Sequence, residues 1–217
     1  MHLAKLAMLA LIALVVAGCG GGSSSEPGTT EPKAGCASVE APPAMPDGDR
    51  ERPAEPLDPA KTYTLELLTS CGSFTITLDV SQAPNTTASL VALARAGFFD
   101  DTVFHRIVPG FVIQGGDPTQ TGSGGPGYQT VDAPPSDARY VKGVVAMAKT
   151  ADEPAGTSGS QFFVVTGEDI GLPPDYAIVG TVTAGLDVVT AIGELGDPAT
   201  ELPLQPVVIE KVTVGES

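Results

Sequence analysis

Residues 104–118 read FHRIVPGFVIQGGDP, and this stretch decides the fold of the whole chain. It contains most of two short apolar runs, Val103–Val108 and Phe111–Gln114, which Pro109-Gly110 separates. Short apolar runs bounded by Gly and Pro are typical of buried strands. The stretch therefore predicts two short strands with a sharp connection between them.

Similar patterns extend from this stretch in both directions. Residues 63–68 and 73–78 alternate apolar and polar side chains around a Gly-containing turn, which predicts an antiparallel hairpin. Pro84 and Gly97 are typical of the first turn and the C-terminal cap of a helix, and a shorter helix is expected at residues 186–192. Further strands are expected at residues 143–148, 162–166, 177–182 and 207–214. The pattern favours a mainly β domain built as a closed antiparallel barrel with helices over its ends, and a sandwich stays open as the alternative.

The stretch 104–118 resembles the signature of the cyclophilins, a family of peptidyl-prolyl cis–trans isomerases, almost residue for residue. Three further blocks follow in the family's order: GSGG at 122–125, GVVAMA at 143–148 and GSQFF at 159–163. The resemblance covers about residues 61–214 and assigns residues 61–217 to one isomerase domain. It implies a closed eight-stranded antiparallel barrel capped by two α-helices, with an extended X-Pro peptide bound on the outer face.

The resemblance also implies a role for individual side chains. Arg106 is implied as the catalytic donor to the prolyl nitrogen, and Gln114 as the group that steadies Arg106 and binds the substrate backbone. The residues implied to form an apolar slot for proline are Phe111, Val112, Phe163 and Leu172. The other implied substrate contacts are His105, Ala148, Lys149, Thr150, Gln161 and Tyr176. The expected reaction moves no electrons, groups or protons, so no cofactor is expected.

Three positions depart from the family pattern. Gly171 stands where the family often has Trp, and Tyr176 stands where it often has His. Because that Trp is linked with cyclosporin binding, we expect weak sensitivity to the drug. Lys149 replaces a residue that is commonly Asn, and we expect it to place a charge at the rim of the site.

Other functions are less well supported by the residues. The glycines near residue 122 lack the Lys-Ser or Lys-Thr of a phosphate loop, and His105 is the only His outside the first 18 residues, so neither a nucleotide site nor a metal site is expected. A net charge of −15 repels phosphate backbones, so nucleic acid is not an expected partner. A proline-peptide module without catalysis and a chaperone-like protein remain alternatives, although neither needs Arg106. We expect a monomer.

The N-terminus has the pattern of an export signal. Residues 6–17 are an uncharged apolar run that spans about 18 Å as a helix, too short for a bilayer core of about 30 Å. The run ends in Val16-Ala17-Gly18-Cys19, which resembles a bacterial lipobox. Residues 1–18 are therefore expected to be a lipoprotein signal peptide, and Cys19 the lipidated residue. The protein is expected to be anchored at the outer face of the bacterial cell membrane, or in the periplasm.

Residues 19–60 are rich in Gly, Ser and Pro, which predicts a tether between the lipid and the domain. Cys36 in this segment and Cys71 in the domain remain after Cys19. Export favours a disulfide between them, and two free thiols are the alternative. Such a bridge would hold the C-terminal half of the tether on the domain.

Overall fold

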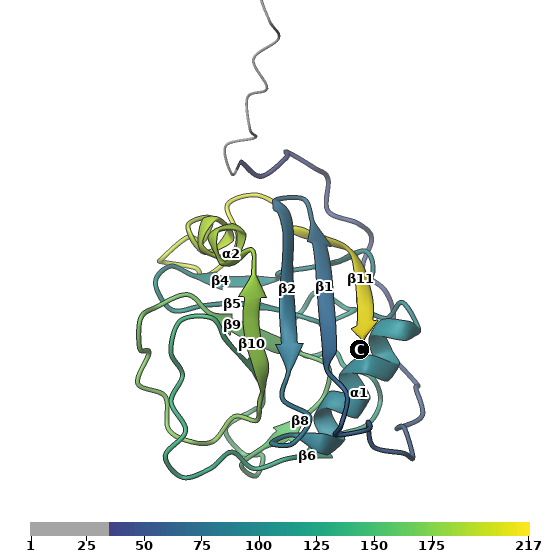
Figure 1. Ribbon diagram of the computed structural model, residues 1–217. Coiled ribbons are helices and arrows are strands. Elements are labelled where there is room, and N and C mark those ends of the chain that lie inside the picture. Colours follow the sequence, from purple (N-terminus) through teal and green to yellow (C-terminus); the bar gives the residue numbers. More distant parts are fainter. Residues whose placement is uncertain (1–34) are drawn as a thin grey trace, which may run out of the picture. The chain divides into compact units, whose positions relative to one another are not determined.

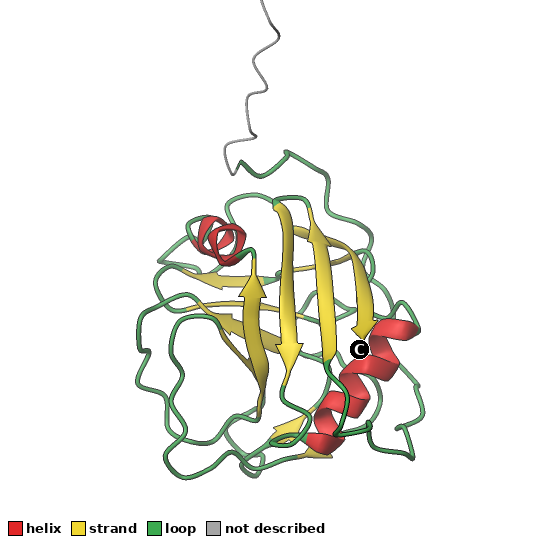
Figure 2. Ribbon diagram, in the orientation of Figure 1, coloured by secondary structure: helices red, strands yellow, loops and turns green. Residues whose placement is uncertain are grey.

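A computed structural model describes residues 35–217. The expected signal peptide, Cys19 and the first part of the expected tether lie outside the described residues. Within residues 35–217 the protein is mainly β with two helices, one near each end of a curled sheet (Figures 1 and 2).

The predicted hairpin is confirmed. Strands β1 (Tyr63–Thr69) and β2 (Gly72–Leu78) pair antiparallel, with Leu65 opposite Ile76 and Leu67 opposite Phe74. These four side chains are buried, because alternate residues of a strand point to the same face. The hairpin thus supplies one wall of the main core.

The sheet has nine strands rather than eight, and it is open. Its order is β3-β11-β1-β2-β10-β7-β9-β5-β4, and a separate two-stranded sheet pairs β6 with β8. The bounds of the remaining strands are β3 Thr102–Val103, β4 Arg106–Val108, β5 Val112–Gly115, β6 Thr130–Val131, β7 Val144–Met147, β8 Thr157–Ser158, β9 Phe162–Val165, β10 Ile178–Ala184 and β11 Val208–Glu216. In Figure 1, β4, β5 and β9 cross behind β1, β2 and β10, so the sheet curls strongly without closing.

The expected closed barrel was wrong because the run Val103–Val108 is two strands, which lie at opposite edges of the sheet. The amide of Phe104 donates to the carbonyl oxygen of Val207 at 3.0 Å, which extends the pairing of β3 with its neighbour β11. On the other edge strand, β4, the amide of Ile107 donates to the carbonyl oxygen of Glu201 at 2.9 Å, so β4 bonds to the segment before β11 and not to β3.

Both predicted helices are present, as α1 (Pro84–Arg95) and α2 (Leu186–Gly193). Pro84 occupies the first turn of α1, and Gly97 follows its end with φ +68°, a left-handed conformation that glycine adopts readily. The amide of Phe98 donates to the carbonyl of Leu93, and the amide of Gly97 to that of Ala94, which together form a Schellman cap.

Strands β7 and β9 are buried on both faces, which explains their continuous apolar runs, and β5 between β9 and β4 is buried except at Gln114. One face, with residues such as Ile113 and Phe162, belongs to the main core inside the sheet. The other face belongs to a second apolar cluster, whose buried members are Val112, Tyr140, Val144, Ala146, Phe163 and Val165. This second cluster underlies the functional site.

Residues 36–50, here called the strap, lie on the domain, as expected for a chain in which Cys36 and Cys71 are bridged, so the folded unit begins before the expected boundary at residue 61. A disulfide joins Cys36 to Cys71. Backbone hydrogen bonds then run from Met45 to Pro118, Gly48 to Gly125 and Arg50 to Pro126, each at 2.8 or 2.9 Å. Figure 1 shows this segment in purple, passing around the outside of the sheet.

The strap passes so close to the chain at Gly127 that no side chain fits there. A Cβ on Gly127 would lie 2.5 Å from the carbonyl oxygen of Gly48, and Gly127 also has φ +91°. Glycine is therefore required at this crossing. Neither helix of residues 35–217 has the length and apolar run needed to cross a bilayer.

Replacing both Cys36 and Cys71 with Ser is expected to lower the free energy of unfolding by about 2–4 kcal/mol, because the bridge closes a long loop in the unfolded chain. Urea unfolding of the variant and of the native protein, each with and without a reductant, measures this. The reductant should lower the midpoint of the native protein only. An equal midpoint for oxidised native protein and variant would contradict the prediction.

Candidate active site

The register of four neighbouring strands places the main site residues in one row. Arg106 on β4 lies opposite Gln114 on β5, Gln114 lies opposite Phe163 on β9, and Phe163 lies opposite Ala146 on β7. Directly opposed residues share one face of a sheet and touch. The row therefore sets a cation, an amide and an aromatic ring side by side on the outer face.

A chain of side-chain hydrogen bonds runs from this row. Arg106 Nε donates to Glu201 at 2.6 Å, and Arg106 Nη1 donates to Gln114 Oε1 at 3.3 Å. Gln114 Nε2 donates to Gln161 Oε1 at 3.0 Å, and Gln161 Nε2 donates to the carbonyl of Gly124 at 2.9 Å. The guanidinium is thus held from two directions. The series of hydrogen bonds continues into residues 122–125, here called the glycine-rich loop.

An open hollow of about 320 Å³ lies beside the guanidinium and is here called the slot. Its lining contains Arg106, Phe111, Val112, Gln114, Ala148, Lys149, Phe163, Leu172 and Tyr176. All four residues expected to hold proline are among them. The slot therefore combines an apolar wall with two positively charged side chains, Arg106 and Lys149.

Tyr140 supports the slot from beneath, and the sequence carried no signal for it. Its ring is fully buried and packs with those of Phe163 and Tyr176, at centroid distances of 6.4 and 6.0 Å. The Tyr140 hydroxyl donates to the carbonyl of Tyr176 at 2.7 Å and accepts from the amide of Tyr176 at 3.0 Å. Tyr140 thereby fixes the aromatic wall at Tyr176.

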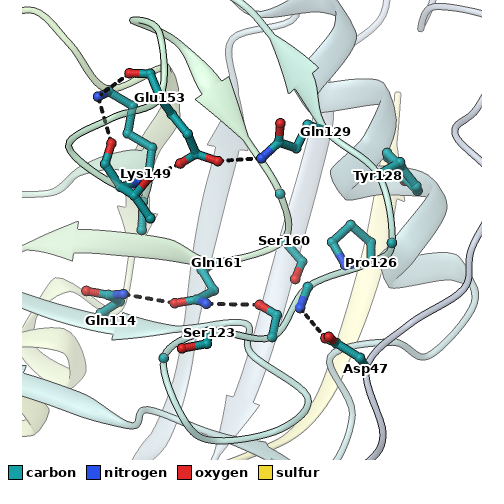
Figure 3. A pocket seen from close by; sticks show the side chains of 17 residues that line it. Asp47, Gln114, Ser123, Pro126, Tyr128, Gln129, Lys149, Glu153, Ser160 and Gln161 are labelled. Carbon is teal, nitrogen blue, oxygen red and sulfur yellow. Dashed lines mark hydrogen bonds between the residues drawn. The ribbon is translucent and has the colours of Figure 1, made fainter.

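A second hollow of about 650 Å³ adjoins the slot and shares Gln114, Ala148 and Lys149 with it (Figure 3). Thr150 and Gln161, two expected substrate contacts, line this second hollow and not the slot. The other lining residues are Asp47, Gly122, Ser123, Gly124, Gly125, Pro126, Gly127, Tyr128, Gln129, Glu153, Gly159 and Ser160. A peptide in the slot can thus extend along a groove beside the glycine-rich loop.

Asp47 comes from the strap, so residues expected to be a tether contribute to the groove. Its carboxylate accepts from the amide of Gly125 at 2.8 Å, as Figure 3 shows. Composition alone could not reveal this role, because it depends on the path of the strap, which backbone hydrogen bonds at Met45, Gly48 and Arg50 hold on the domain.

Lys149 does not place a free charge at the rim, contrary to the expectation. Its side chain is 2% exposed and its Nζ lies 2.6 Å from a carboxylate oxygen of Asp175. The same Nζ donates to the carbonyls of Thr150 and Glu153 at 3.1 and 3.0 Å (Figure 3). A buried ammonium requires such partners, so Lys149 folds inward and holds the loop that follows β7.

His105 lines neither hollow. It lies beside Gly122, and neither ring nitrogen has a hydrogen-bond partner within residues 35–217. Burial lowers the pKa of His105, which keeps the ring neutral near pH 7. Gly171, at the position where the family often has Trp, has φ +63°, a conformation that strains any side chain.

Asp117 organises the glycine-rich loop from inside. It is fully buried, and its carboxylate accepts from the amides of Thr119, Thr121, Gly122 and Gly124 at 2.6–3.2 Å and from the Thr119 hydroxyl. Burial by itself raises the pKa of Asp117, but the hydrogen bonds outweigh burial and lower it. No group of three or more His, Cys, Asp or Glu side chains placed to hold a metal occurs in the described part of the chain.

Comparison with known proteins identifies the family. Residues 64–214 match the family described as "Cyclophilin type peptidyl-prolyl cis-trans isomerase/CLD". The chain is 37% identical over 174 residues to peptidyl-prolyl cis-trans isomerase A of Mycobacterium tuberculosis, covering 72% of this chain and 94% of that protein. It is 36% identical over 151 residues to peptidyl-prolyl cis-trans isomerase ppi1 of Schizosaccharomyces pombe, covering 68% of this chain and 96% of that protein.

Solved structures support the same family assignment. A crystal structure of a cyclophilin type peptidyl-prolyl cis-trans isomerase from Cryptosporidium parvum superposes with a TM-score of 0.65 at 30% identity, covering 71% of this chain and 98% of that one. A second structure of that protein, at 29% identity, was determined in the presence of the dipeptide Ala-Pro. The chain described here belongs to the cyclophilin family and is a peptidyl-prolyl cis–trans isomerase.

Replacing Asp117 with Asn is expected to cost about 2 kcal/mol of stability near neutral pH, because the amide NH2 would face backbone donors in a buried site. The pKa of Asp117 in the folded protein lies below the ordinary aspartate value of 3.8, so its stabilising effect is complete above that value and is lost as pH falls through the lower, folded pKa. Urea titrations at a series of pH values should show that the difference in free energy of unfolding between native protein and variant becomes smaller in acid. A difference in free energy of unfolding that stays constant with pH would contradict this account.

Proposed function

We propose that Arg106 and the slot catalyse rotation about X-Pro bonds, and that the protein does so outside the cytoplasm on exported polypeptides. The observation that carries the catalytic part is the position of the Arg106 guanidinium, in the wall of an apolar hollow that Phe111 and Phe163 also line.

The reaction needs only a change in geometry. Partial double-bond character gives the amide a rotation barrier of about 18–20 kcal/mol, so uncatalysed exchange takes tens of seconds or longer. A catalyst must bind the twisted bond better than either planar form. Each 1.36 kcal/mol of such selective binding is worth about tenfold in rate.

Arg106 can provide that selectivity. In the twisted state the prolyl nitrogen loses amide resonance and regains a lone pair, which can accept a hydrogen bond. A guanidinium stays protonated and presents rigid N–H donors. The contacts with Glu201 and Gln114 use two of its five donors and leave the others for substrate. The apolar wall would hold the proline ring while the carbonyl side of the bond turns.

Export and lipidation are supported by the sequence pattern at residues 1–19. The Cys36–Cys71 disulfide is a second support, since disulfides persist in oxidising compartments. We propose that Cys19 carries the lipid and that residues 20–35 link it to the strap. Proline-containing segments of proteins that fold after export are then the natural substrates.

Arg106→Ala is expected to lower kcat/KM for a short Ala-Pro peptide by about a hundredfold, the usual effect of removing a donor aimed at a transition state. A protease-coupled or NMR exchange assay measures this. Arg95→Ala is a matched control, because Arg95, the last residue of α1, pairs with Glu216 on β11 and lines neither hollow. If native protein and Arg106→Ala are both inactive yet bind the peptide equally, the site is a docking surface instead.

Cys19→Ala is expected to move the protein from the membrane fraction to the soluble fraction of an expressing bacterium, and to abolish incorporation of a labelled fatty acid. Cell fractionation and metabolic labelling measure the two effects. Cys36→Ser is the control, since it removes a cysteine without removing the lipobox. Continued labelling of Cys19→Ala would refute lipidation at this residue.

A further inference from the structure

Glu201 is an acidic partner of Arg106 that no motif indicated. Its carboxylate lies 2.6 Å from Arg106 Nε, although the two residues are 95 positions apart in the chain. Within residues 35–217 it is the only carboxylate that forms an ion pair with Arg106. Both side chains are partly exposed, at 34% for Arg106 and 46% for Glu201. An ion pair so exposed adds little to stability.

The backbone of Glu201 is nevertheless held in an uncommon conformation. Its φ is +60°, in the left-handed region that residues other than glycine seldom adopt. The Glu201 amide donates to the carbonyl of Asp197 at 2.7 Å, and the Glu201 carbonyl accepts from the amide of Ile107 at 2.9 Å. Strained backbone that surrounding bonds enforce is found most often at functional sites.

The bond to Ile107 ties this loop to β4 at the residue next to Arg106. The backbone contact and the side-chain contact therefore act on the same strand, one residue apart. Glu201 holds the Nε edge of the guanidinium, while Gln114 holds it at Nη1. Two fixed points define the plane of the group and direct its free donors.

We propose that Glu201 is a positioning residue for catalysis, which orients the Arg106 guanidinium toward the slot. This inference rests on the proposed catalytic role of Arg106. A free arginine side chain samples many rotamers, and ordering it in the transition state would slow the reaction. Glu201 orders it in advance, at the cost of a strained residue in the loop.

The decisive variant is Glu201→Gly, because it separates activity from stability. Glycine adopts a positive φ readily, so the midpoint of thermal unfolding of the variant is expected to equal or exceed that of the native protein. Activity is expected to fall, with kcat for an Ala-Pro peptide reduced about fivefold and KM little changed, as for an interaction that acts in the transition state.

Glu201→Gln keeps an oxygen that can accept from Nε and should lose less activity than Glu201→Gly. Glu194→Gln is the matched control: Glu194 is exposed, follows α2 and lines neither hollow. It should leave kcat unchanged. The side-chain ¹⁵N signal of Arg106 Nε, recorded by NMR, should shift and broaden in Glu201→Gly and remain as in the native protein in Glu194→Gln.

An unchanged kcat in Glu201→Gly, with native activity intact, would overturn the inference and leave the proposed function standing. A higher kcat in either Glu201 variant would also overturn it, since Glu201 would then compete with substrate for the guanidinium. If the native protein itself fails to accelerate isomerisation, the proposed function fails instead.

Discussion

The pairing of β4, β5 and β9 is the constraint on which the site depends. Arg106, Gln114 and Phe163 meet only because they occupy opposed positions on three adjacent strands. A slip of one residue would turn these side chains to the other face of the sheet, where the main core lies. The register thus fixes the chemistry, and the hydrogen bonds among the side chains refine it.

Burial on both faces secures that register. The main core fills the inside of the curled sheet, and the second cluster around Tyr140 covers part of the outside. The slot lies above this second cluster, so its aromatic wall rests on packed side chains rather than on a mobile loop. The glycine-rich loop beside it is held by Asp117 from within and by the strap from without. A rigid groove suits a reaction that only binds and twists its substrate.

Local patterns predicted the parts of the fold that local interactions determine. The β1–β2 hairpin and α1 follow from alternation, Pro84 and Gly97, and the motif at residues 104–118 indicated four of the side chains that line the slot. The open sheet and the inward turn of Lys149 were not predictable in this way. Both depend on partners far along the chain, Val207 and Glu201 for the strand edges and Asp175 for the lysine. Glu201 and Asp47 were missed for the same reason.

The central claim is that Arg106 donates to the prolyl nitrogen as the bond twists, and fluorinated substrates test it most directly. Fluorine at C4 of proline withdraws electrons and weakens the nitrogen as an acceptor, and the two C4 epimers favour opposite ring puckers. The account predicts that acceleration over the uncatalysed rate is smaller for both epimers than for proline, and that this difference disappears in Arg106→Ala. Equal acceleration of all three peptides by the native protein would contradict it.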